Sequence, residues 1–211
     1  HAWIGVILDL VPLHFCKDAH GLYQFDGSWL YEYPYEHDRE NHQWGTANFD
    51  LGKGMTRSFL LSNLKYWLEY FHFDGIRVDA LSYLLYWRGE TTEDKINHAA
   101  IDFIKRVNAM VHTDYKGVLM IAEDSSSFPK VTHSLEDGGI GFDMKWDLGW
   151  MNDTLRYVKL DPIYRKYHHE KLTFSLHYAF NENFILPFSH DEVVHGKRSM
   201  LDKQPGDLWQ K

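Results

Sequence analysis

A dense group of acidic and imidazole side chains follows an apolar segment near the end of the sequence. Residues 184–188 predict a buried strand, and His190, Asp191, Glu192 and His195 then occur within six positions. Residues of these types are typical of a metal centre, a salt-bridged surface turn, or one corner of a carboxylate-based active site.

The spacing argues against a metal centre. A zinc pair on a helix needs histidines four positions apart, with glutamate directly after the first. Here His190 and His195 are five apart and Glu192 comes one place too late, while His168 and His169 are adjacent and would diverge by about 100° on a helix. We predict no metal. No G-x-S-x-G elbow indicates a serine nucleophile, and no glycine-rich loop indicates a phosphate site.

Four carboxylates share a position directly after an apolar segment: Asp9, Asp79, Glu123 and Asp191. In parallel α/β folds, and in (β/α)8 barrels above all, ligands bind at the carboxyl ends of the strands. A single carboxylate there would be unremarkable, because it could cap the next helix. Four carboxylates in this position favour a functional site at the carboxyl ends of the strands.

Arg77 and Asp79 lie two positions apart on one predicted strand, so their side chains point to the same face. A cation beside Asp79 is expected to lower its pKa, which suits a nucleophile. The alternative is a structural ion pair, although burying one is costly without further partners. Glu123 has no basic neighbour in sequence, and nearby anions would raise its pKa, which suits an acid. Two carboxyl groups whose pKa values are shifted in opposite directions are typical of retaining glycosyl transfer.

The elements that would position these residues alternate between strands and helices. Strands are predicted at 3–11, 74–81, 116–125, 141–150 and 183–192, and helices at 56–71, 92–112 and 167–180. Thr91 or Thr92 is the predicted N-cap of the second helix. The alternation favours a parallel α/β architecture. The aromatic-rich loop 17–55 is too long for a plain connection, which indicates a functional segment.

Composition excludes several classes of function. The 211 residues carry a net charge of −8 without a basic cluster, which argues against a nucleic-acid partner. No apolar stretch approaches the roughly 20 residues that span a bilayer. The single Cys16 excludes an internal disulfide and fits the reducing cytoplasm. The sequence lacks an initiator Met and a charged leader, so we expect a piece of a longer protein without a signal peptide.

Four segments together resemble the signature regions of the α-amylase family of glycoside hydrolases, in the family's order. They are "VILDLVPLHF", "GIRVDAL", "IAEDSS" and "FSHDEVVH". Further stretches are similar to the bacterial branching enzymes within that family. They are "HFCKDAHGLYQFDGSWLYEY", "NHQWGTANFDLGK", "FDMKWDLGWMNDTL" and "HGKRSMLDKQPGDLWQK". The resemblance covers nearly the whole chain. It implies a partial (β/α)8 TIM barrel, approximately strands 3 to 7, with residues 1–211 forming part of one catalytic domain.

The resemblance also implies roles for the carboxylates. Asp79 matches the nucleophile that forms a glucosyl ester, and Glu123 matches the general acid and later base. Asp191 matches the third carboxylate, which holds sugar hydroxyls and stabilises the transition state.

Four further residues match substrate-binding positions of the family. Arg77 and His190 match residues that contact the nucleophile and the sugar at the cleavage point. His14 matches a histidine on the same sugar, and Asp9 a carboxylate that braces the site. No cofactor is implied.

Leu10 and Leu13 depart from the family pattern, because branching enzymes usually carry Trp and Gly at these positions. Leu13 is expected to crowd the turn at His14 and to reduce activity. Calcium-binding amylases carry Asn at the position of Leu13, and leucine offers no oxygen ligand, so we predict no calcium there.

The resemblance predicts an enzyme that cleaves α-1,4-glucan and transfers the oligosaccharide to a glucose 6-hydroxyl, forming the α-1,6 branches of glycogen. One alternative is an α-glucan hydrolase of the same family, and another is a glucan-binding relative without activity. The expected partner is an α-glucan, without nucleic acid or membrane, together with the missing barrel strands and flanking domains. Alone, the segment is expected to be unstable or inactive, because an open arc of strands leaves its edges unpaired.

Overall fold

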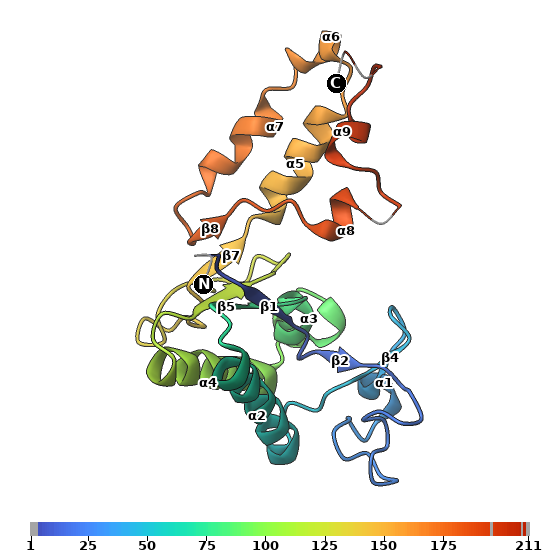
Figure 1. Cartoon of the computed structure of the whole chain (residues 1–211), viewed down its shortest axis with the longest axis vertical. Helices are drawn as coiled ribbons and strands as arrows, with labels where there is room; N and C mark the ends of the chain where they lie inside the picture. The colour runs from blue at the N-terminus through green and yellow to red at the C-terminus, as the bar shows by residue number, and fades with distance from the viewer. Residues whose placement is uncertain (1–3, 195, 208, 210–211) are drawn as a thin grey trace. The chain divides into compact units, whose positions relative to one another are not determined.

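The computed structural model describes residues 4–194, 196–207 and 209. The chain divides into two compact units, His1–Met144 and Lys145–Lys211, which we call the first and second units (Figure 1). That residues 1–211 form part of one catalytic domain stays a prediction. Among the described residues, no helix is long and apolar enough to cross a membrane.

Three parallel strands form the centre of the first unit, in the order β1 (Ile7–Leu10), β5 (Gly75–Val78) and β6 (Leu119–Ala122). All four residues of β5 are buried, the charged Arg77 included. Strand β1 pairs with β5 alone among the described strands, and about half the surface of Ile7 is exposed. The strands predicted within 3–11, 74–81 and 116–125 are confirmed.

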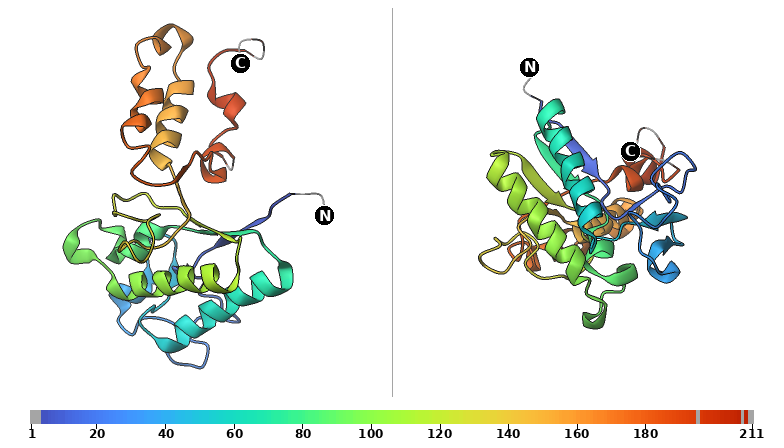
Figure 2. Two further views of the ribbon diagram at one scale, coloured as in Figure 1. Left: turned by 90° about the vertical axis from the view of Figure 1, so that its left-hand side faces the viewer. Right: turned by 90° about the horizontal axis from the view of Figure 1, so that it is seen from below.

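Helix α2 (Gly54–Phe71) covers one face of the sheet of the first unit (Figure 2). One stripe of its side chains is buried. Its buried residues recur every four positions, which is close to one helical turn. They are Thr56, Leu60, Leu64 and Leu68. Phe71, predicted on the same stripe, is exposed, because the helix ends there and His72 takes a left-handed conformation with φ of 55°.

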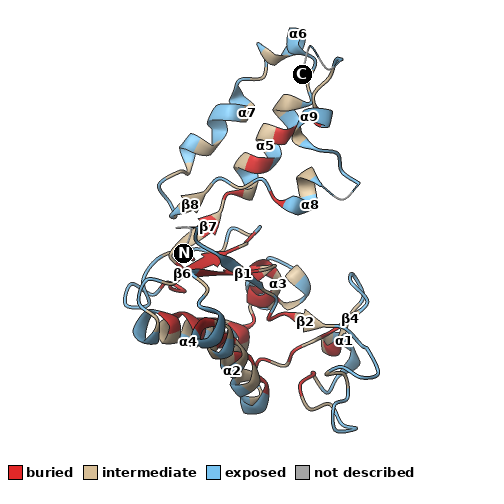
Figure 3. Cartoon of the chain, viewed as in Figure 1, coloured by how far each residue is buried: buried red, intermediate tan, exposed pale blue. Residues whose placement is uncertain are grey.

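Helix α4 (His98–Asp114) lies on the same side of the sheet as α2, and its buried face is visible in Figure 3. The predicted N-cap at Thr91 or Thr92 is wrong. Asn97 is the cap, and its side chain accepts a hydrogen bond from Ala100 N at 3.1 Å. Thr92 instead precedes a separate 3-10 turn, Glu93–Lys95, so the acidic residues that suggested a first helical turn belong to that turn.

Two short helical elements follow β5 in the first unit. They are α3 (Leu81–Leu85) and the 3-10 turn Trp87–Gly89. Four of the five residues of α3 are buried, so this short helix belongs to the hydrophobic core.

The long segment 17–55 is folded into its own small structure. It contains α1 (Glu36–Arg39), β3 (Glu40–Asn41) and β4 (Thr46–Asn48). Strand β4 is the centre of a small sheet and pairs antiparallel with β3 on one side and with β2 (His14–Phe15) on the other. The buried Glu32 carboxylate accepts hydrogen bonds from the backbone N–H groups of Gln24 and Tyr31 at 2.7 and 3.1 Å. These contacts hold the segment in a fixed path, and its own function stays a prediction.

The second unit begins within β7 (Met144–Trp146), whose Lys145 and Trp146 pair in parallel with β8 (Phe184–Ile185). A helix follows each strand, α5 (Leu148–Val158) after β7 and α8 (His190–Val193) after β8. The buried strand predicted over 184–188 is too long. Only two residues pair, and Leu186 and Phe188 are exposed.

Three short helices and one 3-10 turn complete the second unit. They are α6 (Pro162–Arg165), α7 (Glu170–Thr173), the 3-10 turn Phe174–His177 and α9 (Met200–Lys203). The helix predicted over 167–180 is therefore shorter than expected and changes to 3-10 geometry.

Candidate active site

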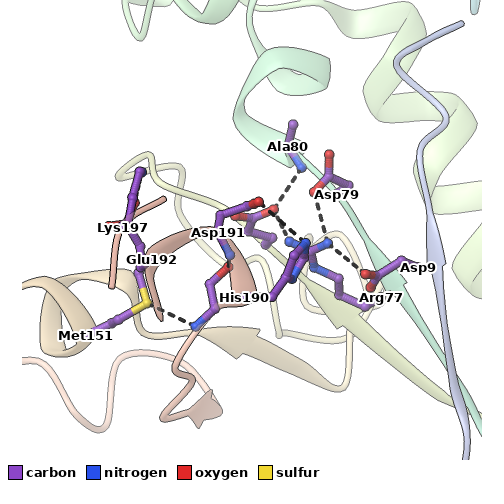
Figure 4. Close-up of polar contacts among 11 residues, drawn as sticks. Asp9, Arg77, Asp79, Ala80, Met151, His190, Asp191, Glu192 and Lys197 are labelled. Atoms are coloured by element: carbon purple, nitrogen blue, oxygen red, sulfur yellow. Dashed lines mark hydrogen bonds and ion pairs between the residues drawn. The ribbon is translucent and has the colours of Figure 1, made fainter. Parts of the chain in front are cut away.

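Arg77 lies at the centre of the carboxylates in the first unit, and only 3% of its surface is exposed. Strand register places Arg77 opposite Asp9 on β1, and its Nη1 lies 3.3 Å from Asp9 Oδ2. The same nitrogen lies 2.9 Å from Asp79 Oδ1, and Nη2 contacts Glu123 Oε2 (Figure 4). One guanidinium therefore binds a carboxylate on β1 and the carboxylates that follow β5 and β6.

The position of Glu123 follows from strand pairing. Arg77 on β5 pairs with Ile121 on β6, and Glu123 comes two residues later, so its side chain projects to the same face. The backbone continues this alignment, because Glu123 N donates to Val78 O at 3.0 Å and Leu81 N donates to Glu123 O at 2.8 Å. The sequence shows no base beside Glu123, yet parallel pairing brings Arg77 into contact with it.

Burial first, and a hydrogen bond with Asp79 second, raise the pKa of Glu123 to about 7. The Arg77 guanidinium and the Ala80 N–H act in the opposite direction, but burial outweighs them. The expectation of a raised pKa is confirmed, with a different main cause, since we expected neighbouring anions rather than burial. A carboxyl group with this pKa is partly protonated near neutral pH and can act as an acid.

A tight turn separates β5 from α3 and fixes Asp79. Ala80 takes a left-handed conformation with φ of 48°, which costs a non-glycine residue roughly 1–2 kcal/mol. Its N–H points to Glu123 Oε2 at 3.3 Å, while Asp79 N donates to Leu10 O at 2.9 Å. The strained residue thus lies between the two carboxylates and binds one of them.

His14 lies on β2 and is electrostatically linked to Asp79. Burial lowers the pKa of His14, and the negative charge of Asp79 partly opposes this effect. His14 Nδ1 is hydrogen-bonded to Thr46 Oγ1 at 2.5 Å, and its ring packs on Trp44 with centroids 5.0 Å apart. The neutral imidazole is therefore favoured, held between a strand neighbour and an aromatic ring.

Leu13 fits its position without backbone strain. Its side chain is buried in the core of the first unit, and its carbonyl accepts from Phe49 N at 3.0 Å. Leu13 is absent from the residues with positive φ, so the backbone at this position does not require glycine. That Leu13 crowds His14 and lowers activity stays a prediction.

His190 and Asp191 lie in the second unit, at the start of α8. Ser189 is the N-cap and accepts from Asp191 N at 3.2 Å, while Ser189 N donates to Met151 Sδ at 3.4 Å (Figure 4). His190 Nε2 lies 3.4 Å from Asp191 Oδ1, and both side chains are more than half exposed. The joint action of Asp191 with Asp79 and Glu123 stays a prediction.

The rest of the opening cluster behaves as a surface turn. Glu192 accepts from Lys197 Nζ at 2.7 Å, with both side chains partly exposed. His195 lies outside the described residues. The salt-bridge interpretation therefore holds for Glu192, while His190 and Asp191 remain available for other contacts.

The sequence of the chain was compared with curated proteins. It is 58% identical to 1,4-alpha-glucan branching enzyme GlgB of Bacillus subtilis over 99% of this chain. It is also 58% identical to the GlgB of Geobacillus stearothermophilus, over the full length of this chain. In sequence, the chain is similar to the 1,4-alpha-glucan branching enzymes. It spans about a third of the length of these relatives. No protein-family model matches it.

Solved structures with a similar fold are α-amylases. The maltogenic α-amylase AmyB from Thermotoga neapolitana matches 74% of the chain and 31% of its own with a TM-score of 0.50, at 16% identity. The α-amylase from Geobacillus thermoleovorans, solved with acarbose, matches 74% of the chain and 33% of its own with a TM-score of 0.51, also at 16% identity. These likenesses confirm the α/β fold class and the partial barrel.

Sequence reasoning missed three features of the site. Asp124 is buried and accepts from both Ser126 N and Ser126 Oγ, which fixes the turn after Glu123. The left-handed Ala80 carries no signal in its residue type. Trp44, far along the chain from Asp79, reaches the site through His14, and only the aromatic content of segment 17–55 pointed to it.

Proposed function

We propose that this chain supplies the central catalytic part of a 1,4-alpha-glucan branching enzyme, a retaining glycosyltransferase that makes α-1,6 branches in glycogen. The observation that carries the proposal is the buried Arg77, which binds Asp79 and Glu123 together while Glu123 keeps a proton near neutral pH. The 58% identity to GlgB proteins supports the same reaction.

The first half of the reaction breaks an α-1,4 bond. The carboxylate of Asp79 attacks the anomeric carbon, and Glu123 gives its proton to the departing glycosidic oxygen. The electron pair of the broken bond goes to that oxygen, and the oligosaccharide becomes an ester of Asp79. Arg77 orients Asp79 for this attack at an Nη1–Oδ1 distance of 2.9 Å.

The second half transfers the oligosaccharide to its acceptor. Glu123, now a carboxylate, takes the proton of a glucose 6-hydroxyl, whose oxygen attacks the anomeric carbon and releases Asp79. Two displacements retain the α configuration. Water in place of the 6-hydroxyl would give hydrolysis, so exclusion of water decides between a transferase and a hydrolase.

The remaining residues bind the substrate in this proposal. His14, favoured as a neutral imidazole, contacts the sugar at the cleavage point, and Asp9 braces Arg77 from the neighbouring strand. Asp191 and His190, exposed at the start of α8, contact hydroxyl groups of the same sugar. The expected location is the cytoplasm.

Linkage analysis of amylose treated with the full-length protein tests the proposal. The expected result is a rise in α-1,6 linkages with little increase in reducing ends. Release of reducing sugar without new branches would contradict the proposal and would identify the protein as an α-glucan hydrolase. Binding of glucan without either product would identify a relative that has lost catalysis.

A further inference from the structure

A cavity in the first unit is lined by residues of segment 17–55 together with Tyr83 and Arg88. Its volume is about 310 Å³, within the range of ligand sites. Polar and aromatic side chains line it, among them Glu40, Asn41, Gln43, Tyr83 and Arg88. None of these residues belongs to the cluster around Arg77.

Tyr83 is held firmly in the wall of this cavity. Its ring packs edge-on against Trp44 with centroids 4.9 Å apart, and its hydroxyl donates to Gln43 Oε1 at 2.7 Å. On the other side, Gly89 approaches so closely that a Cβ there would lie 2.8 Å from Tyr83 Cε1. Gly89 also has a φ of 70°, which favours glycine, so both the backbone conformation and the close approach of Tyr83 require glycine at this position.

The charged groups in the cavity wall already have partners. Glu40 binds Lys17 Nζ at 2.6 Å, and this contact lowers the pKa of Glu40. Arg88 Nη2 lies 3.7 Å from Asp38 Oδ1. Because both charges are compensated, the cavity favours an uncharged ligand.

Amide groups of the wall suit the hydroxyls of such a ligand. The Asn41 amide donates to Asn48 Oδ1 at 3.1 Å, which fixes its orientation. The bond from Tyr83 to Gln43 Oε1 turns the Gln43 amide nitrogen toward other acceptors. Fixed donors and acceptors in a cavity whose wall charges are paired are what a ligand rich in hydroxyl groups requires.

Trp44 connects the cavity with the carboxylate cluster. Its ring contacts Tyr83 on one side and His14 on the other, at centroid distances of 4.9 and 5.0 Å, and it is 42% exposed. We propose that the cavity binds one glucosyl unit of the α-glucan away from the bond that is cleaved, and that Tyr83 and Gln43 help to select the chains that bind. This proposal rests on the proposed function, because the glucan is its substrate.

Substitution of Gln43 and Tyr83 tests the proposal in the full-length protein. Gln43→Ala changes an exposed side chain, so the fold is preserved, and Tyr83→Ala removes the ring as well. Each is expected to raise the KM for amylose about fivefold, as loss of one hydrogen bond to substrate would, with kcat within about twofold. Tyr115→Phe is the matched control, because its hydroxyl donates to Glu69 at 2.6 Å outside the cavity. An unchanged KM in Gln43→Ala and Tyr83→Ala would overturn the proposal.

Calorimetric titration of maltoheptaose into protein carrying Asp79→Ala separates this proposal from the branching reaction. Adding Gln43→Ala is expected to weaken binding about fivefold. If the wild-type protein makes no branches but this loss occurs, the cavity is a glucan site and the proposed reaction is wrong. Equal binding with and without Gln43→Ala would reject the cavity as a glucosyl site, whatever the reaction.

Discussion

The surroundings of Arg77 in the first unit and of Asp191 in the second differ in almost every respect. Arg77 is 3% exposed and binds carboxylates from three neighbouring strand ends. Asp191 is 66% exposed on its side chain, and its backbone is fixed by the Ser189 cap of a four-residue helix. The first group is positioned by strand pairing, and the second by local hydrogen bonds.

Because of this difference, substitutions in the two regions are expected to affect the stability of the fold and the rate of the reaction to different degrees. A side chain buried among charges affects both the fold and the reaction, because its removal leaves its partners without compensation. An exposed side chain affects the reaction alone. If both regions serve one reaction, substitutions in them should lower activity alike and stability very differently.

The largest expected effect is that of Asp79→Ala on activity. Removal of the nucleophile is expected to lower branching by at least about 10⁴-fold, or roughly 5.5 kcal/mol of transition-state stabilisation. Counting α-1,6 linkages formed per unit time measures this. Turnover similar to the wild type would show that Asp79 is not the nucleophile.

Arg77→Ala is expected to lower the free energy of unfolding by about 3–5 kcal/mol, because Glu123 and Asp79 lose their shared cation. Denaturant titration of the full-length protein measures the change. Arg106→Ala is the matched control, since Arg106 is exposed and lies 3.1 Å from Asp102, and a change within about 0.5 kcal/mol is expected there. Equal effects of the two substitutions would contradict the central position of Arg77.

Asp191→Asn sharpens the contrast with Arg77. Activity is expected to fall about 10³-fold, because the third carboxylate no longer stabilises the transition state, while the free energy of unfolding stays within about 0.5 kcal/mol. Linkage analysis and denaturant titration on the same preparation give both numbers. Normal branching in Asp191→Asn would leave the α8 region without a part in the reaction.

The pH dependence of activity reports on Glu123. Its pKa is raised to about 7, so it is protonated below that pH and loses the proton above it. The rate of glucan cleavage is therefore expected to fall about tenfold per pH unit above about pH 7. In Glu123→Gln the residual rate should lack this falling limb. A limb that persists in Glu123→Gln would assign it to another group.

Ala80→Gly has the smallest expected effect. Glycine tolerates the φ of 48° at this position, so a gain of up to about 1 kcal/mol in unfolding free energy is expected. Ala122→Gly, at the buried end of β6, should instead lose stability. Thermal denaturation of both variants compares them, and a loss in Ala80→Gly would show that Ala80 is not strained.

The part of the fold that depends on local pattern was predictable from sequence. Apolar runs gave the three strands of the first unit, and the stripe from Leu60 to Leu68 gave α2. Helix boundaries failed where two signals competed, as at Thr92 and Asn97, both of which can cap a helix. The strand predicted over 184–188 failed because Pro187 and the Ser189 cap end it early.

The candidate site was predictable in its residues rather than its contacts. Parallel register explains why Asp79 and Glu123, separated by more than forty positions, meet at Arg77. The contact between Arg77 and Glu123, the burial of Glu123 and the left-handed Ala80 depend on packing across strands, which no local pattern encodes. The cavity beside Tyr83 was missed for the same reason, since Gln43 and Tyr83 lie far apart in sequence.

Mass spectrometry of the covalent intermediate tests the central claim that Asp79 is the nucleophile and Glu123 its acid. An α-glucosyl fluoride needs no acid to leave, so Glu123→Gln protein incubated with it should accumulate a glucosyl ester. The account predicts one added glucosyl mass on the peptide that contains Asp79, and none after Asp79→Ala. Modification of a different residue, or the same labelling in Asp79→Ala, would contradict it.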